Sequence, residues 1–72
     1  MNDTNIEGLR AFVLERRKAL NLSQKQVGEG IAVSRRTYQR KEDTMEFTLV
    51  EFAKLAKVLK FRIQLSNVFT FV

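Results

Sequence analysis

The sequence predicts a mainly helical bundle of four helices, followed by one C-terminal strand. Three segments begin with Ser or Thr followed three residues later by Glu or Gln, a pattern in which two side chains satisfy free amides at the start of a helix. Apolar residues follow at the spacing of three or four that one helix face requires. The last segment instead alternates apolar and polar residues, as a half-buried strand does. The predicted capping pairs are Thr4 with Glu7, Ser23 with Gln26, and Thr48 with Glu51.

The 72 residues are enough for one domain with a thin margin of stability. The chain has no Cys and no His, so it cannot form a disulfide or use the ordinary ligands of a structural zinc. Its stability must come from packing, helped by a second subunit. We expect a DNA-binding unit over residues 1–60, and a strand and apolar tail over 61–72 that mediate dimerisation.

The charge of the chain is strongly basic. Its 13 Lys and Arg residues exceed its 8 Asp and Glu residues and give a net charge of +5, as in many proteins that bind nucleic acid. No segment approaches the roughly 20 apolar residues of a membrane span, and the first residues lack the basic and apolar regions of a signal peptide. We therefore expect a cytoplasmic protein with no membrane partner.

The first two predicted helices are separated by a break at Asn21. The first begins at Thr4 and carries an apolar stripe at helical spacing. The stripe consists of Ile6, Leu9, Val13 and Leu20, with Phe12 beside it. The second helix is short, begins after Ser23 and ends near Gly30 or Ile31.

The third and fourth predicted helices differ in charge. The third covers residues 34–41 and is capped by Ser34. Its basic residues, with no acidic residue among them, are Arg35, Arg36, Arg40 and Lys41. The fourth begins at Thr48 and runs to about Leu59. Its predicted buried face consists of Leu49, Phe52, Leu55, Ala56 and Leu59.

The second and third helices are separated by a tight turn over residues 32–34. Two short helices this close need apolar side chains in the angle between them and a small residue where their backbones approach. Gly28 meets the second requirement. The first is met by Val27, Ile31, Val33 and Tyr38. This pattern predicts a helix-turn-helix, the motif that places its second helix in the major groove of DNA.

The same residues resemble the lambda-repressor-like family of bacterial and phage regulators, also called the Xre family. The matching residues are Leu22, Ser23 and Gln24 at the start of the second helix, residues 31–34 at the turn, and residues 35–42 on the third helix. The resemblance covers roughly residues 9–59. It implies a lambda-repressor-like helical bundle in which Arg17 and Glu42 form a structural ion pair.

The sequence departs from the family pattern at three places. Ala32 occupies the turn position where the family commonly has a left-handed glycine, and a Cβ there costs about 1 kcal/mol or more. Lys41 stands where a partly buried apolar residue is common, and Asp43 and Thr44 replace a glycine. We expect the differences to affect the end of the third helix and the loop over residues 43–47.

The resemblance implies that the third helix reads DNA bases. Arginine can donate two hydrogen bonds to guanine, and glutamine suits adenine. The predicted base contacts are Arg35, Arg36, Gln39 and Arg40, and the predicted phosphate contacts are Gln24, Lys25, Ser34 and Lys41. These residues imply a sequence-specific transcriptional regulator that binds double-stranded operator DNA and represses its own operon. The alternative interpretation of the basic helix is a solvated charged face.

The segment over residues 61–66 alternates like a strand but has no second strand to pair with. Pairing with the same strand of a second copy would give a homodimer, with Phe61, Ile63 and Leu65 at the interface. The order of helix and strand looks like the HipB-type antitoxins within the family, which implies a kinase-like toxin as a further partner. The apolar tail over residues 68–72 either covers the dimer core or docks on a protein partner.

The sequence gives little support for an enzyme. It has no His, no Cys and no glycine-rich phosphate loop, and its acidic residues are scattered over helix ends and a loop. We expect no catalytic residues, no metal and no cofactor. The rival hypothesis is a protein-interaction module with little specific DNA binding, which the departures at Ala32 and Lys41 favour.

Overall fold

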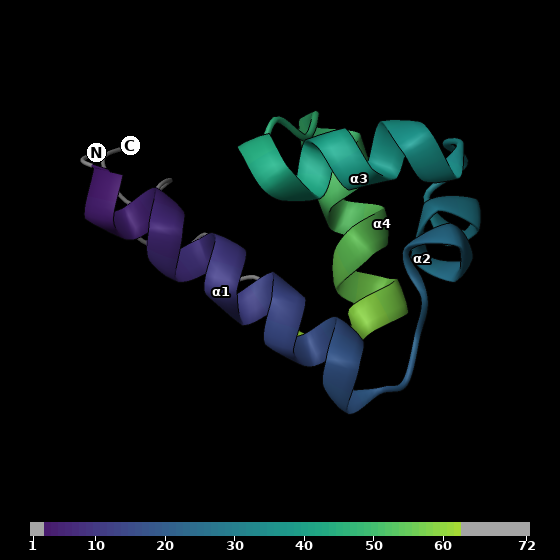
Figure 1. Cartoon of the computed structure of the whole chain (residues 1–72), viewed down its shortest axis with the longest axis horizontal. Coiled ribbons are helices and arrows are strands. Elements are labelled where there is room, and N and C mark those ends of the chain that lie inside the picture. Colours follow the sequence, from purple (N-terminus) through teal and green to yellow (C-terminus); the bar gives the residue numbers. More distant parts are fainter. Residues whose placement is uncertain (1–2, 63–72) are drawn as a thin grey trace, which may run out of the picture.

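The computed structural model describes residues 3–62, which form four helices and no strand within that range. The helices are α1 (Asp3–Ala19), α2 (Gln24–Gly30), α3 (Arg35–Thr44) and α4 (Leu49–Leu59). In Figure 1, α2, α3 and α4 gather into one body, and α1 is a long rod whose N-terminal end extends beyond that body. No helix in this range is long and apolar enough to cross a membrane.

All four helices contribute to one core. Its buried side chains are Val13, Val27, Ile31, Tyr38, Leu55 and Leu59. The residues predicted to fill the angle between the second and third helices do so: Val27 and Tyr38 are fully buried, Ile31 is nearly so, and Val33 packs against them. That prediction is confirmed.

A row of aromatic rings crosses the molecule beside this core. Phe12 of α1 meets Phe61 edge to face, with ring centroids 5.2 Å apart. Phe61 lies 5.8 Å from Phe52, which lies 6.1 Å from Phe47. Phe47 in turn lies 6.1 Å from the buried Tyr38 of α3. Such pairs contribute roughly 0.5–1.5 kcal/mol each beyond the area they bury, so the row connects α1 to α3 through α4.

The starts of α2 and α4 agree with the capping pairs predicted for them. The Ser23 hydroxyl accepts a hydrogen bond from the Gln26 amide, and the Gln26 side chain accepts one from the Ser23 amide. Thr48 and Glu51 make the same reciprocal pair. At α1 the prediction is wrong, because the helix already includes Asp3 and Thr4 lies inside it. The Thr-x-x-Glu pattern marks a start only when the residue before it leaves the helix.

The third helix is longer than predicted. It continues past Lys41 to Thr44 and ends where Met45 adopts a left-handed conformation with φ 59°. With no glycine after Glu42, the residues predicted as the start of a loop stay helical until Met45 takes the conformation that glycine would favour.

Some apolar residues face solvent where the sequence predicted a buried face. Leu49 is 76% exposed, because it lies on the first turn of α4 before the helix reaches the core. Ile6, Leu9 and Phe12 are each about two-fifths exposed. Ile6 and Leu9 belong to the N-terminal part of α1, which extends beyond the body formed by the other helices (Figure 1), whereas Phe12 packs against Phe61.

The predicted strand is not seen in the described residues. Residues 61 and 62 have no regular secondary structure, and residues 63–66 lie outside the described range. The Phe61 amide donates to the Ala56 carbonyl at 3.0 Å, which closes the end of α4 after the left-handed Lys60. That amide therefore already has its hydrogen-bond partner within one chain.

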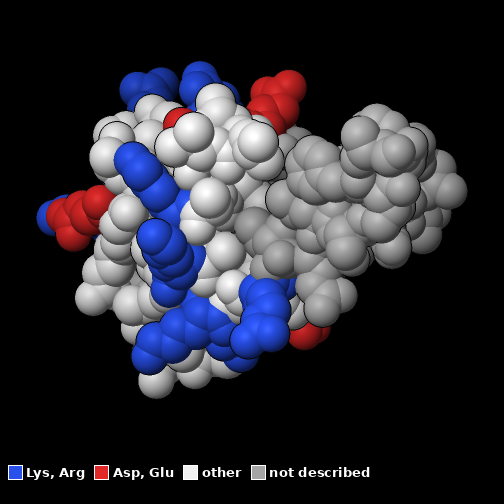
Figure 2. All heavy atoms as spheres, turned by 180° about the vertical axis from the view of Figure 1, so that it is seen from behind, with Lys and Arg blue, Asp and Glu red and all other residues white. Residues whose placement is uncertain are grey.

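Basic side chains lie on more than one side of the molecule. Arg35, Arg36 and Arg40 are exposed on α3, and Lys54 and Lys57 are exposed on α4. Seen from behind, Lys and Arg side chains form a line down the molecule that spreads along its lower edge (Figure 2). The positive charge is thus divided between an arginine-rich helix and a lysine-rich one.

Candidate nucleic-acid interface

The connection between α2 and α3 is held by backbone hydrogen bonds. The Val33 amide donates to the Gly28 carbonyl at 2.9 Å, and the Ala32 amide donates to the Glu29 carbonyl at 3.1 Å. A Cβ on Gly28 would lie 3.1 Å from the Val33 carbonyl oxygen and 3.2 Å from the Tyr38 Cβ. Ala32 has φ 65°, in the left-handed region that favours glycine. The angle between the helices therefore depends on glycine at position 28 and is kept despite alanine at position 32.

The outer face of α3 carries the four predicted base contacts. Ser34 caps the helix, and its hydroxyl oxygen accepts from the Thr37 amide at 3.1 Å. The exposed side chains on this face are Arg35, Arg36, Gln39 and Arg40. None of the three arginines forms an ion pair with another described residue. Arg36 and Arg40 are one helical turn apart and so lie on one stripe.

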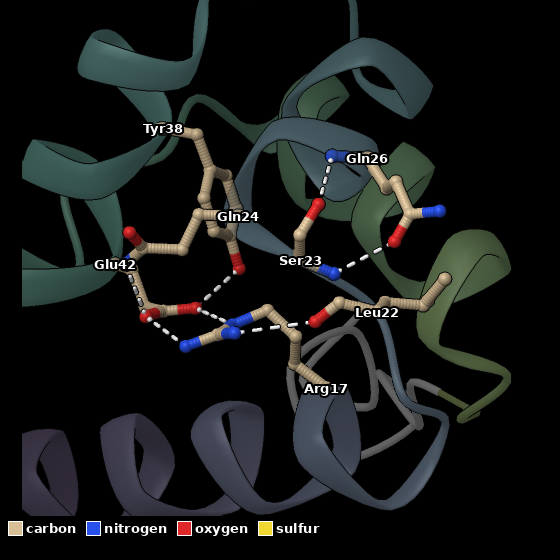
Figure 3. Close-up of polar contacts among 7 residues, drawn as sticks. All are labelled: Arg17, Leu22, Ser23, Gln24, Gln26, Tyr38 and Glu42. Atoms are coloured by element: carbon tan, nitrogen blue, oxygen red, sulfur yellow. Dashed lines mark hydrogen bonds and ion pairs between the residues drawn. The ribbon is translucent and has the colours of Figure 1, made fainter.

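Beneath α3, the Glu42 carboxylate is the centre of a buried polar cluster (Figure 3). The Arg17 guanidinium donates to both carboxylate oxygens, from Nε at 2.7 Å and from Nη2 at 3.1 Å. The Gln24 amide donates to Oε1 at 3.0 Å, and the Tyr38 hydroxyl donates to Oε2 at 2.8 Å. Arg17 also donates to the Leu22 carbonyl at 3.2 Å. One carboxylate thus connects α1, α2 and α3.

The cluster keeps Glu42 ionised despite its burial. Burial alone would raise the pKa of the Glu42 carboxyl, but hydrogen bonds from Arg17, Gln24 and Tyr38 outweigh it, and the pKa lies below its ordinary value. The hydrogen bond to Glu42 raises the pKa of Arg17. Burial, together with the hydrogen bond to Glu42, raises the pKa of Tyr38. Arg17 and Glu42 therefore form a charged pair at neutral pH, and Tyr38 is a neutral donor to it.

The four predicted phosphate contacts differ in their surroundings. Lys25 is exposed at the start of α2. The Gln24 side chain is half-buried and donates to Glu42, and the Ser34 hydroxyl is used as the helix cap. The Lys41 ammonium lies 3.0 Å from the Glu51 carboxylate and 3.2 Å from the Glu46 carbonyl, and its side chain is 15% exposed. Only Lys25 among these four has an exposed cationic side chain outside such contacts.

An open groove of about 820 Å³ separates the N-terminal half of α1 from α3. One wall is formed by Glu7, Arg10, Ala11 and Leu14, and the other by Arg36, Gln39, Arg40 and Asp43. Arg10 and Asp43 face each other across it at 3.5 Å. The base-reading stripe predicted on α3 therefore borders a groove that also contains carboxylates.

Sequence reasoning missed Arg16, which holds α1 to the end of α4. Its guanidinium donates to the Leu59 carbonyl at 3.1 and 2.9 Å and to the Lys60 carbonyl at 3.0 Å. These carbonyls have no partner within the helix, so the arginine satisfies them and complements the negative end of the helix dipole. The spacing of Arg16 could have revealed this contact. Arg16 follows Val13 by three residues and precedes Leu20 by four, so it lies on the predicted apolar stripe that faces the other helices.

The structure brings Arg36, Gln39 and Arg40 together on one wall of the groove and leaves Ile63 and Leu65 outside the described residues. No family model, curated protein or solved structure matches the chain.

Proposed function

We propose that this chain is a sequence-specific DNA-binding regulator in which α2, residues 31–34 and α3 act as a helix-turn-helix. The observation that carries the proposal is the outer face of α3, where three arginines and a glutamine are exposed and the arginines have no ion-pair partner among the described residues. The pair of Arg17 with Glu42 beneath the helix supports a lambda-repressor-like protein. In this proposal α3 lies in the major groove.

Two stripes on α3 divide the base contacts. Arg36 and Arg40 lie on one stripe, and Arg35 and Gln39 lie on the neighbouring stripe, each pair separated by one turn. An arginine that donates to both O6 and N7 of guanine discriminates by about 1–3 kcal/mol against a wrong base. Arg36 and Arg40 would read guanines, and Gln39 would read an adjacent adenine.

Phosphate contacts fix the position of the protein on the duplex without reading sequence. The geometry favours Lys25 for this role, because its ammonium is exposed at the start of α2. Gln24 and Ser34 would contact phosphates through backbone amides at helix starts, since their side chains bind within the protein. Lys41 is directed toward Glu51 and contributes least.

The proposal also includes a homodimer, which rests on the sequence alone. A homodimer paired through Ile63 and Leu65 would present two copies of α3 to half-sites about one helical turn apart. It would act in the cytoplasm, repress its own operon by occluding it, and, following the resemblance to HipB-type antitoxins, bind a kinase-like toxin.

The second candidate function is a protein-interaction module with little specific DNA binding. Glu7 and Asp43 favour it, because both lie on the groove that borders Arg36 and Arg40. Carboxylates repel phosphates, whereas a protein partner with mixed charges would fit both signs in the groove.

Fluorescence anisotropy distinguishes the two candidates. The labelled duplexes are the DNA upstream of the chain's own reading frame and an unrelated duplex of equal length, each measured at several salt concentrations. A regulator binds the upstream DNA at least about a thousandfold more tightly and loses affinity steeply with salt. Equal, weak binding to both duplexes would contradict the proposal.

Substitutions locate the contact. Arg36→Ala should relax the preference at one base pair, whereas Lys25→Ala should weaken binding to every sequence alike. Lys18→Ala is the matched control, since it removes an exposed charge from α1 without touching α2 or α3. If Lys18→Ala changes specificity as much as Arg36→Ala does, α3 is not the reading helix.

A further inference from the structure

The outer face of α4 has two chemically different halves. Its exposed residues, including the C-cap, are Leu49, Val50, Ala53, Lys54, Lys57 and Lys60. Leu49 and Val50 are 76% and 64% exposed and have the most accessible large apolar side chains of the described residues. Apolar contact surface therefore lies at the start of the helix, and positive charge follows over its second half.

The lysines on this face are not neutralised. None of Lys54, Lys57 and Lys60 forms an ion pair with another residue in the range 6–62. The acidic residue of α4, Glu51, is held away from them by the Lys41 ammonium at 3.0 Å. Figure 2 shows basic side chains in a line down the back of the molecule, with the acidic side chains in view lying outside it.

We propose that the outer face of α4 binds an acidic segment of a partner protein. Apolar side chains of that segment would cover Leu49 and Val50, and its carboxylates would meet the lysines that follow. Val50 and Lys57 are about 10 Å apart along the helix, so two turns of a partner helix suffice. The charge of the lysine half selects an acidic partner, and the apolar half supplies contact area that remains at high salt.

DNA and an anionic membrane surface fit this face less well than an acidic protein segment does. A DNA backbone would satisfy the lysines but leave Leu49 and Val50 without apolar cover. A membrane-surface helix needs an apolar stripe along its length, whereas the second half of this face is entirely basic. The face shares no residue with the outer face of α3, so the inference holds whether or not α3 binds DNA.

The test uses the full chain and a fluorescein-labelled helical peptide that carries two leucines in its first turn and glutamates at helical spacing after them. We expect the Lys54→Gln/Lys57→Gln variant to bind the peptide about three- to tenfold more weakly, as two exposed ion pairs imply. Val50→Ser should weaken it by a similar factor. The matched control, Lys18→Gln, removes an exposed lysine from α1 and should bind like the parent chain.

Competition decides the class of partner. An unlabelled copy of the peptide should displace the probe, whereas a non-operator duplex and phosphatidylglycerol vesicles should not. The inference is overturned if the parent chain does not bind the peptide, if the control variant loses as much affinity as Lys54→Gln/Lys57→Gln, or if duplex or vesicles displace the probe. None of these outcomes depends on operator recognition by α3.

Discussion

Glu42 shows at the scale of one residue how the fold is specified. Its carboxylate accepts hydrogen bonds from Arg17, Gln24 and Tyr38, which come from three different helices. The pairing with Arg17 could be expected from the family resemblance. The donations from Gln24 and Tyr38 could not, because Gln24 looked like an exposed phosphate contact and Tyr38 only like a core ring. Both depend on where the packed helices place the carboxylate.

The titration of Glu42 gives the first prediction. Because its pKa is lower in the folded chain than in the unfolded one, its contribution to the free energy of unfolding is full above the unfolded pKa, about 4.3, and is lost as the pH falls through the folded pKa. Carbon-13 NMR of the carboxyl, with urea unfolding from about pH 7 to about pH 3, measures both effects. The exposed-site variant Glu46→Gln should keep the acid dependence. A carboxyl that titrates above its ordinary value would show that burial dominates.

Ala32 gives a prediction of the opposite sign from most substitutions. Its φ of 65° costs an alanine about 1 kcal/mol, so Ala32→Gly should raise the free energy of unfolding by up to that amount. Ala53→Gly, on the exposed side of α4, should lower it by about 0.5–1 kcal/mol. Denaturant midpoints measure both. If Ala32→Gly and Ala53→Gly both lower the free energy of unfolding, the left-handed Ala32 is not strained.

At the scale of elements, the approach of α2 to α3 depends on Gly28. A methyl group there would press on the Val33 and Ser34 carbonyl oxygens and on the Tyr38 Cβ, all within 3.3 Å. We expect Gly28→Ala to cost about 1–3 kcal/mol of unfolding free energy, measured by thermal or urea unfolding. Gly8→Ala is the matched control in α1, where nothing lies within 4 Å, and it should stabilise by about 0.5–1 kcal/mol. Stabilisation by both substitutions would contradict the close approach.

Helix boundaries were predictable where the signal is local. The reciprocal pairs of Ser23 with Gln26 and Thr48 with Glu51 act within four residues, so α2 and α4 begin where the sequence indicates. The end of α3 was not predictable in this way, because it depends on Met45 adopting a left-handed conformation. Long-range contacts could not be predicted from the sequence either. Lys41 was predicted as one more exposed cation of a basic helix, but the fold places Glu51 beside it and the two residues form an ion pair.

At the scale of the whole molecule, one residue of the predicted dimer surface already packs within a single chain. Phe61 was expected at the interface, yet its ring packs on Phe12 and Phe52 and its amide closes α4. The proposed dimer contact therefore reduces to Ile63 and Leu65, which lie outside the described residues. The base contacts on α3 stay a prediction, and the exposure of their side chains could be predicted because all four lie on one helix.

The dimer proposal predicts different effects for these residues. Ile63→Ser/Leu65→Ser should give a monomer that keeps its helical circular dichroism, as measured by sedimentation equilibrium. Phe61→Ala should instead lower the unfolding free energy, by less than the roughly 3–5 kcal/mol of a fully buried ring, because Phe61 is half-buried against Phe12 and Phe52. A serine double variant that remains dimeric, or a parent chain that is monomeric at every concentration, would refute the strand-paired assembly.

Each of the four helices in residues 3–62 is followed within two residues by a left-handed residue that is not glycine: Asn21, Ala32, Met45 and Lys60. These positions affect which substitutions the sequence can accept as it evolves. At Asn21, Ala32 and Lys60, which are exposed, a substitution to glycine would relieve backbone strain without removing a side chain from the core, whereas Met45 packs against the core. A chain with so small an interior can therefore accept destabilising changes on its binding surfaces and recover its folding at the turns.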